Sequence, residues 1–62
     1  MSLVEIKFQY GDKVKILPLE KTEGVVRSIW IIAKGITYEV RYFVDGKLNE
    51  VYFFEDELEI AG

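Results

Sequence analysis

Apolar residues alternate with charged or polar residues over most of this chain, in short runs separated by glycines and one proline. Val4, Ile6 and Phe8 alternate with polar neighbours, and so do Val14 and Ile16. No stretch repeats apolar residues at the spacing of an amphipathic helix, and the β-favouring residue types dominate. The pattern therefore predicts an all-β domain. The expected strands are Leu3–Phe8, Lys13–Leu17, Gly24–Ile32, the two arms of a hairpin within Ile36–Phe54, and a short strand holding Leu58 and Ile60.

Turn residues mark the ends of these runs. Tyr10-Gly11-Asp12 and Ala33-Lys34-Gly35 are predicted turns. Pro18 lacks a backbone N–H, so it is predicted to end the second run, and Leu19–Glu23 is expected to be a polar loop. Glu55-Asp56-Glu57 is predicted to form one turn of 3-10 helix before the last strand.

The run Gly24–Ile32 breaks strict alternation, because Val26 and Ile29 cannot face the same side of a regular strand. A bulge near Arg27-Ser28 would bring both side chains to one face. Bulges also bend short strands around a small barrel. The run is therefore predicted to be one bent strand with apolar residues on both faces.

Asp45-Gly46 predicts a two-residue type I′ turn, because both central positions of that turn need positive φ. This turn sets Arg41 opposite Glu50, and opposite charges in such pairs stabilise a hairpin. A slip of one residue would move the apolar set to the other face. The face assigned to the core holds Ile36, Tyr38, Val40, Tyr42, Val44, Val51 and Phe53. The other face is mixed and holds Thr37, Glu39, Arg41, Phe43, Leu48, Glu50, Tyr52 and Phe54.

The composition bounds the chemistry of the chain. Its 62 residues are enough for one domain with one core, so residues 1–62 are expected to form a single domain. The sequence has no cysteine and no histidine, which excludes disulfides, the usual zinc sites, cysteine nucleophiles and serine triads. A calcium or magnesium site would need more oxygen ligands than the adjacent carboxylates Glu55, Asp56 and Glu57 supply. We expect no enzymatic activity, no metal and no cofactor.

Five short motifs follow one another along the chain. They are G-D-K-V-K-I-L at 11–17, E-G-V-V-R-S-I at 23–29, Y-E-V-R-Y at 38–42, D-G at 45–46 and F-F-E-D-E-L at 53–58. In this order they resemble the Tudor, KOW and chromo-related group of SH3-like barrels, and also the small stand-alone SH3-like proteins of bacterial and prophage genomes. The resemblance implies a five-stranded SH3-like barrel with a one-turn 3-10 helix before the last strand.

Two elements carry most of this resemblance. One is the G-x-V-x-x-I element of the KOW type, matched by Gly24, Val26 and Ile29. The other is the aromatic–acidic–leucine motif that precedes the last strand, matched by Phe53, Asp56 and Leu58. Tudor domains that read methyl-lysine take a cage aromatic from the loop after the first barrel strand. Here that loop, residues 18–22, has no aromatic, so a complete cage is not expected. The matched residues are structural, and one fold of this kind serves many functions.

The chain carries more large apolar side chains than a core of this size can hold. Exposed aromatic residues are typical of contact surfaces between proteins. We therefore expect a non-catalytic binding module, a small adaptor that contacts a partner protein or a second copy of itself. The candidate binding residues are Trp30, Phe43, Leu48, Tyr52 and Phe54.

Two alternatives remain open. A nucleic-acid-associated module of the KOW or Tudor kind would use basic residues along one side, namely Lys13, Lys15, Arg27, Lys34 and Arg41. The net charge of −3, from 11 acidic and 8 basic residues, disfavours a phosphate-backbone ligand. The other alternative is an aromatic pocket for a ligand cation, built from Trp30, Tyr42, Phe43 and Tyr52.

The apolar runs are too short for membrane insertion. None approaches the ~20 residues of a membrane-spanning helix. The N-terminus has no basic segment followed by a long apolar one, as a secretory signal would. We expect a cytoplasmic protein that does not associate with membranes.

Overall fold

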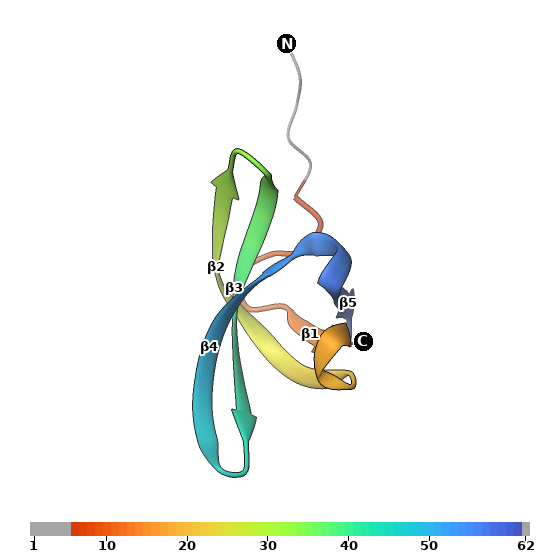
Figure 1. Cartoon of the computed structure of the whole chain (residues 1–62), viewed down its shortest axis with the longest axis vertical. Helices are drawn as coiled ribbons and strands as arrows, with labels where there is room; N and C mark the ends of the chain where they lie inside the picture. Colours follow the sequence, from red (N-terminus) through yellow and green to blue (C-terminus); the bar gives the residue numbers. More distant parts are fainter. Residues whose placement is uncertain (1–5, 62) are drawn as a thin grey trace.

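One long strand, β2 (Thr22–Ile32), organises the sheet because it pairs with two neighbours along its length. Its first half pairs with β1 (Lys13–Ile16) and its second half with β3 (Gly35–Val44). The five strands form one antiparallel sheet in the order β4-β3-β2-β1-β5 (Figure 1). This computed structural model describes residues 6–61. The remaining elements are β4 (Lys47–Phe54), β5 (Leu58–Ile60) and the short 3-10 helices η1 (Leu17–Leu19) and η2 (Glu55–Glu57).

The all-β class is confirmed, and so is the one-turn 3-10 helix before the last strand. The predicted bulge is also confirmed, because the pairing of β2 with β3 shifts register between Val26 and Ser28. Val26 is fully buried, and Ile29 packs against the same core. Strands β4 and β5 stand at the two ends of the sheet order, so closure into a barrel remains a prediction.

The expected polar loop at Leu19–Glu23 is shorter than predicted. β2 begins at Thr22, which lies opposite Ile16 of β1. The Thr22 hydroxyl donates to the Leu19 carbonyl at 2.6 Å and closes a tight turn after η1. Because this turn is complete within a few residues, pairing with β1 starts sooner than the polar sequence suggested.

The β3–β4 hairpin has the predicted register. Asp45 and Gly46 have φ values of 51° and 75°, as a type I′ turn requires. Arg41 lies opposite Glu50, and Val40 lies opposite Val51. The turn residues and the cross-strand pairs therefore specify the same alignment.

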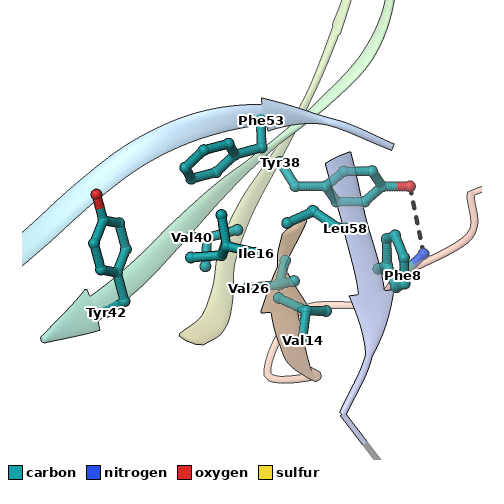
Figure 2. Close-up of a cluster of buried hydrophobic side chains, with 9 residues drawn as sticks. All are labelled: Phe8, Val14, Ile16, Val26, Tyr38, Val40, Tyr42, Phe53 and Leu58. Carbon is teal, nitrogen blue, oxygen red and sulfur yellow. Dashed lines mark hydrogen bonds between the residues drawn. The ribbon is translucent and has the colours of Figure 1, made fainter. Parts of the chain in front are cut away.

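The core lies on the inner side of the bent sheet (Figure 2). Its buried side chains are Phe8, Val14, Ile16, Val26, Tyr38, Val40, Tyr42, Phe53 and Leu58. Val44 and Val51 were predicted to belong to it, and this is wrong, since they are 43% and 41% exposed. The β3–β4 hairpin extends away from β1 and β5 towards its turn (Figure 1). Both valines lie on the predicted face. Val44 is next to the turn and beyond the core. Val51 lies opposite the buried Val40, but it belongs to β4, which ends the sheet order among the described residues.

The predicted entry strand is wrong for Ile6, Lys7 and Phe8, which form no strand; residues 3–5 lie outside the described part. The N–H groups of this segment bond to side chains instead. The Lys7 N–H lies 3.1 Å from both the Tyr38 hydroxyl and Glu55 Oε2. The Phe8 ring is nevertheless fully buried, 5.2 Å from the Tyr38 ring centroid in an edge-on arrangement.

Tyr38 connects the N-terminal segment to η2. Its hydroxyl donates to Glu55 Oε2 and accepts from the Phe8 N–H at 3.4 Å (Figure 2). Burial raises the pKa of the Tyr38 phenol, and the hydrogen bond to Glu55 raises it further. Folding therefore favours the protonated phenol. This stabilisation is fully present below the ordinary phenol pKa of about 10 and is lost as the pH rises through the raised value.

We expect Tyr38→Phe to lower the free energy of unfolding by about 1–3 kcal/mol at neutral pH, because it removes the donor to Glu55 and leaves the buried Phe8 N–H without its partner. The difference in free energy of unfolding between the variant and the wild type should become smaller in alkaline solution, because the wild type loses the same interaction there. Urea titrations over a pH series would measure it. Tyr10→Phe, at an exposed tyrosine, is the matched control. Its stability should fall in alkaline solution to the same extent as that of the wild type. If the stability difference between Tyr38→Phe and the wild type stays constant from neutral pH to well above the phenol pKa, the role given to the Tyr38 hydroxyl is wrong.

Candidate binding surface

Four cross-strand rows cover most of the outer face, which we define as the side of the β2–β3–β4 sheet opposite the core. Their members follow from the register of the three strands, because residues in one row project on the same side. The rows are Trp30–Thr37–Phe54, Ser28–Glu39–Tyr52, Val25–Arg41–Glu50 and Phe43–Leu48. All five predicted binding residues lie on this face, and all five are exposed. Trp30 is therefore a surface residue, 53% exposed.

Trp30 is held in place by a chain of polar contacts. Its indole N–H donates to the Ser28 hydroxyl at 2.9 Å, and that hydroxyl donates to Glu39 Oε1 at 2.9 Å. The ring of Tyr52 stands edge-on to the indole, with centroids 6.0 Å apart and planes at 78°. These contacts fix the orientation of the indole before any ligand arrives, which lowers the entropic cost of binding.

Phe54 extends this aromatic group by one row. It lies opposite Thr37, which in turn lies opposite Trp30. Thr37 is buried although it belongs to the outer face, and its hydroxyl donates to the Trp30 carbonyl at 3.1 Å. We call Trp30, Tyr52 and Phe54 the aromatic cluster. Its arrangement is determined by the pairing of three strands and by three hydrogen bonds.

Phe43 and Leu48 form a second apolar group, opposite each other near the Asp45-Gly46 turn. Phe43 is 65% exposed, the largest value among the predicted binding residues. The Arg41–Glu50 row separates this pair from the aromatic cluster. Leu48 and Tyr52 are four residues apart on β4, or about 14 Å along the strand. Within one chain, the predicted binding residues therefore form two apolar groups on one face.

The Arg41–Glu50 ion pair between the two groups is a surface feature. The Arg41 Nε and a terminal nitrogen of its guanidinium lie 3.1 and 3.0 Å from Glu50 Oε2. Both side chains are more than one-third exposed, so the pair contributes at most about 1 kcal/mol to stability. Its main consequence is that two charged side chains lie between the two apolar groups.

The four aromatics considered as a cation pocket do not converge. Trp30 and Tyr52 contact each other, whereas Phe43 lies near the other end of the face. Tyr42 is buried on the core side, with its ring centroid 6.4 Å from that of Phe53. The arrangement therefore does not fit a single cage built from these residues.

A hollow of about 390 Å³ lies where β2 passes from β1 to β3. Gly24 and the neighbouring backbone of β2 form part of its wall. Its lining includes Lys13, Glu23, Arg27, Arg41 and Phe43. Sequence reasoning did not identify this hollow, although a glycine inside a predicted strand is a known sign of close backbone approach.

The predicted basic side is only partly assembled. Lys13, Arg27 and Arg41 meet at the hollow, and the Arg27 guanidinium also lies 5.3 Å from the centroid of the Tyr10 ring. Lys15 lies opposite Glu59 of β5 instead. Lys34 lies in the turn between β2 and β3, beside a different hollow. The structure therefore gathers three of the five basic residues.

Within residues 6–61, no three acidic side chains lie close enough together to hold a metal ion. Over the same residues, no helix has the length and apolar character needed to cross a membrane.

Neither the family models, nor the curated proteins, nor the solved structures include one that matches this chain. The resemblance to Tudor and KOW barrels therefore stays a prediction, and the small five-stranded antiparallel sheet is consistent with it.

Proposed function

We propose that this protein is a non-catalytic binding module that contacts a partner protein through its outer face. The observation that carries the proposal is the aromatic cluster, three large exposed side chains in a defined arrangement. An SH3-like barrel of the Tudor or KOW type and a cytoplasmic location, as in the small bacterial or prophage proteins that the sequence resembles, are part of the same proposal.

The chemistry of the outer face favours protein as the ligand. Tryptophan and tyrosine are over-represented among the residues that dominate binding energy at protein interfaces. Such residues act best when they are rigid and surrounded by groups that exclude water. Trp30 meets the first condition through Ser28 and Tyr52. Glu39 and Arg41 lie in the adjoining positions of β3 and would form part of the rim.

The double substitution Phe43→Ser with Tyr52→Ser should reduce partner capture by at least about tenfold, since truncating one interface hot spot typically costs 2 kcal/mol or more. Both side chains are exposed, so the fold should survive, and circular dichroism would check this. The measurement is quantitative mass spectrometry of proteins captured by the immobilised domain. Ile60→Ser, an exposed apolar residue on β5, is the matched control and should capture normally. Unchanged capture by the double variant would rule out the outer face.

The hollow lined by Lys13, Arg27 and Arg41 supports a second candidate, a nucleic-acid-associated module. Phosphate contacts would make such binding fall steeply with salt, whereas contact through an apolar face should change little. A fluorescent single-stranded oligonucleotide, titrated at several salt concentrations, separates the two. Salt-sensitive binding that disappears in Lys13→Glu with Arg27→Glu would favour the second candidate, and absence of binding would remove it.

A further inference from the structure

The free edge of β4 carries backbone groups arranged to pair with another strand. β4 ends the sheet order, so among residues 6–61 no strand lies beyond it (Figure 1). The two-residue turn makes Val44 and Lys47 a hydrogen-bonded pair, and such pairs recur at every second residue of an antiparallel hairpin. The residues whose N–H and C=O groups point away from β3 are therefore Leu48, Glu50, Tyr52 and Phe54.

A hydrogen bond of the Phe54 N–H agrees with this alternation of inward and outward backbone groups. The Phe54 N–H donates to Glu57 Oε1 at 2.9 Å, so the carboxylate of η2 satisfies the last donor of the edge. Within the described part of the chain, the edge N–H groups of Leu48, Glu50 and Tyr52 have no such partner. β4 also lacks the proline or bulge that commonly protects an edge. An uncapped edge of this length is a template for strand addition.

We propose that a second copy of this chain adds its own β4 to this edge, antiparallel, with Val51 opposite Val51 across a two-fold axis. Charge and strand length disfavour the two neighbouring registers. An alignment centred on Glu50 would oppose two glutamates, which is destabilising. An alignment centred on Tyr52 would set Leu48 opposite Asp56, beyond the end of β4. The register centred on Val51 avoids both conflicts.

The same register matches the side chains and the backbone groups. Leu48 lies opposite Phe54 of the second copy, and Glu50 lies opposite its Tyr52. Each edge donor thus meets an edge carbonyl, while the Phe54 N–H keeps its bond to Glu57. Every hydrogen-bonded position in this pairing falls on residues whose groups already point outwards.

Opposite charges meet at each end of the contact. In this register, Lys47 falls beside Glu55 of the second copy. Within one chain, the contacts of Glu55 with the Tyr38 hydroxyl and the Lys7 N–H both use Oε2. Oε1 takes part in neither contact, so an ion pair between it and the lysine ammonium would leave the core network in place.

The pairing accounts for the division of the apolar surface. In one chain, the aromatic cluster and the Phe43–Leu48 pair stand about 14 Å apart along β4. Across the two-fold axis, Phe54 of one copy would adjoin Leu48 of the other. One continuous row would then run from Trp30 through Phe54 to Leu48 and Phe43 of the second copy. The edge contact goes beyond the proposed function, because it uses the backbone of β4 and not the outer face.

The solution mass, measured by light scattering on a sizing column over a concentration series, tests the pairing. The wild type should move from monomer to dimer as concentration rises. Glu50→Pro should raise the dissociation constant by more than tenfold, because proline removes an edge N–H that β3 does not use. Glu50→Thr, which also loses the Arg41 ion pair but keeps the N–H, should dimerise like the wild type. A wild type that stays monomeric, or a dimer unaffected by Glu50→Pro, overturns the proposal.

A cysteine introduced into this cysteine-free chain tests the register without relying on proline. Val51→Cys should form a covalent dimer with oxidised glutathione, because facing residues of a non-hydrogen-bonded pair have Cα atoms about 4.5 Å apart. Asn49→Cys should not, because its counterpart would lie about 14 Å away along the strand. Equal cross-linking at both positions overturns the register. If the wild type is monomeric but still captures partner proteins through the outer face, the edge pairing is contradicted and the proposed function is not.

Discussion

Replacing Phe8 with alanine should remove about 3–5 kcal/mol from the free energy of unfolding, the usual cost of deleting a buried phenylalanine. The side chain is fully buried and contacts the edge of the Tyr38 ring. A 62-residue domain has a total stability of only about 3–9 kcal/mol. Phe8→Ala should therefore leave the protein marginally folded or unfolded at room temperature, although Phe8 belongs to no strand.

Urea unfolding, followed by Trp30 fluorescence and circular dichroism, measures this effect. Phe8→Leu keeps most of the buried volume, so it should lie between the alanine variant and the wild type. Tyr10→Ala removes an exposed aromatic from the same segment, where the stacked Arg27 contributes only about 0.5–1 kcal/mol. If Phe8→Ala were no more destabilised than Tyr10→Ala, the N-terminal segment would not be part of the core.

Local signals explain why the hairpin and the bulge were predictable from sequence. The positive φ values of Asp45 and Gly46 are a property of the turn residues themselves, and they fix the alignment of every pair that follows. The bulge followed from the phasing of Val26 and Ile29, because two core residues three positions apart require an extra residue in the strand. Neither inference needed knowledge of distant contacts.

The entry segment shows where local reasoning fails. Its alternation is typical of a strand, but the Lys7 and Phe8 N–H groups bond to the Tyr38 hydroxyl, some 30 residues later in the sequence. No property of residues 6–8 indicates that a distant side chain will take these donors. The exposed Val44 and Val51 illustrate a second limit. Alternation assigns a face to each residue, but it does not say how far along a strand the core extends, as at Val44, or which strand ends the sheet, as at Val51.

The arrangement of the candidate site depended on the same long-range information. The sequence indicated five candidate binding residues and assigned four of them to the outer face of the hairpin, but it did not indicate how they group. Grouping depends on the register of β2 after the bulge, which sets Trp30 opposite Thr37 and so near Phe54 and Tyr52. The hollow beside Gly24 depends on the crossing of β2 from β1 to β3, which is also a tertiary feature.

Gly24→Ala should be the most damaging substitution at a glycine whose surroundings the structure resolves, lowering the free energy of unfolding by about 3 kcal/mol. A Cβ atom here would lie 2.6 Å from Val40 Cγ1 and 2.9 Å from the Arg41 carbonyl oxygen. A change of rotamer at Val40 would relieve the first contact. The second is with backbone, so β2 and β3 would have to separate where the sheet bends.

Two comparisons separate this steric cost from other effects of replacing glycine. Gly46→Ala meets no atom within 4 Å but holds a left-handed φ of 75°, so it should cost only about 1–2 kcal/mol. In a Val40→Ala background, Gly24→Ala should cost less than in the wild type, because its nearest neighbour is gone. The remaining cost should not vanish, since the Arg41 carbonyl stays in place. Urea midpoints for the four-member cycle provide the measurement, and strict additivity would show that Gly24 and Val40 are not in contact.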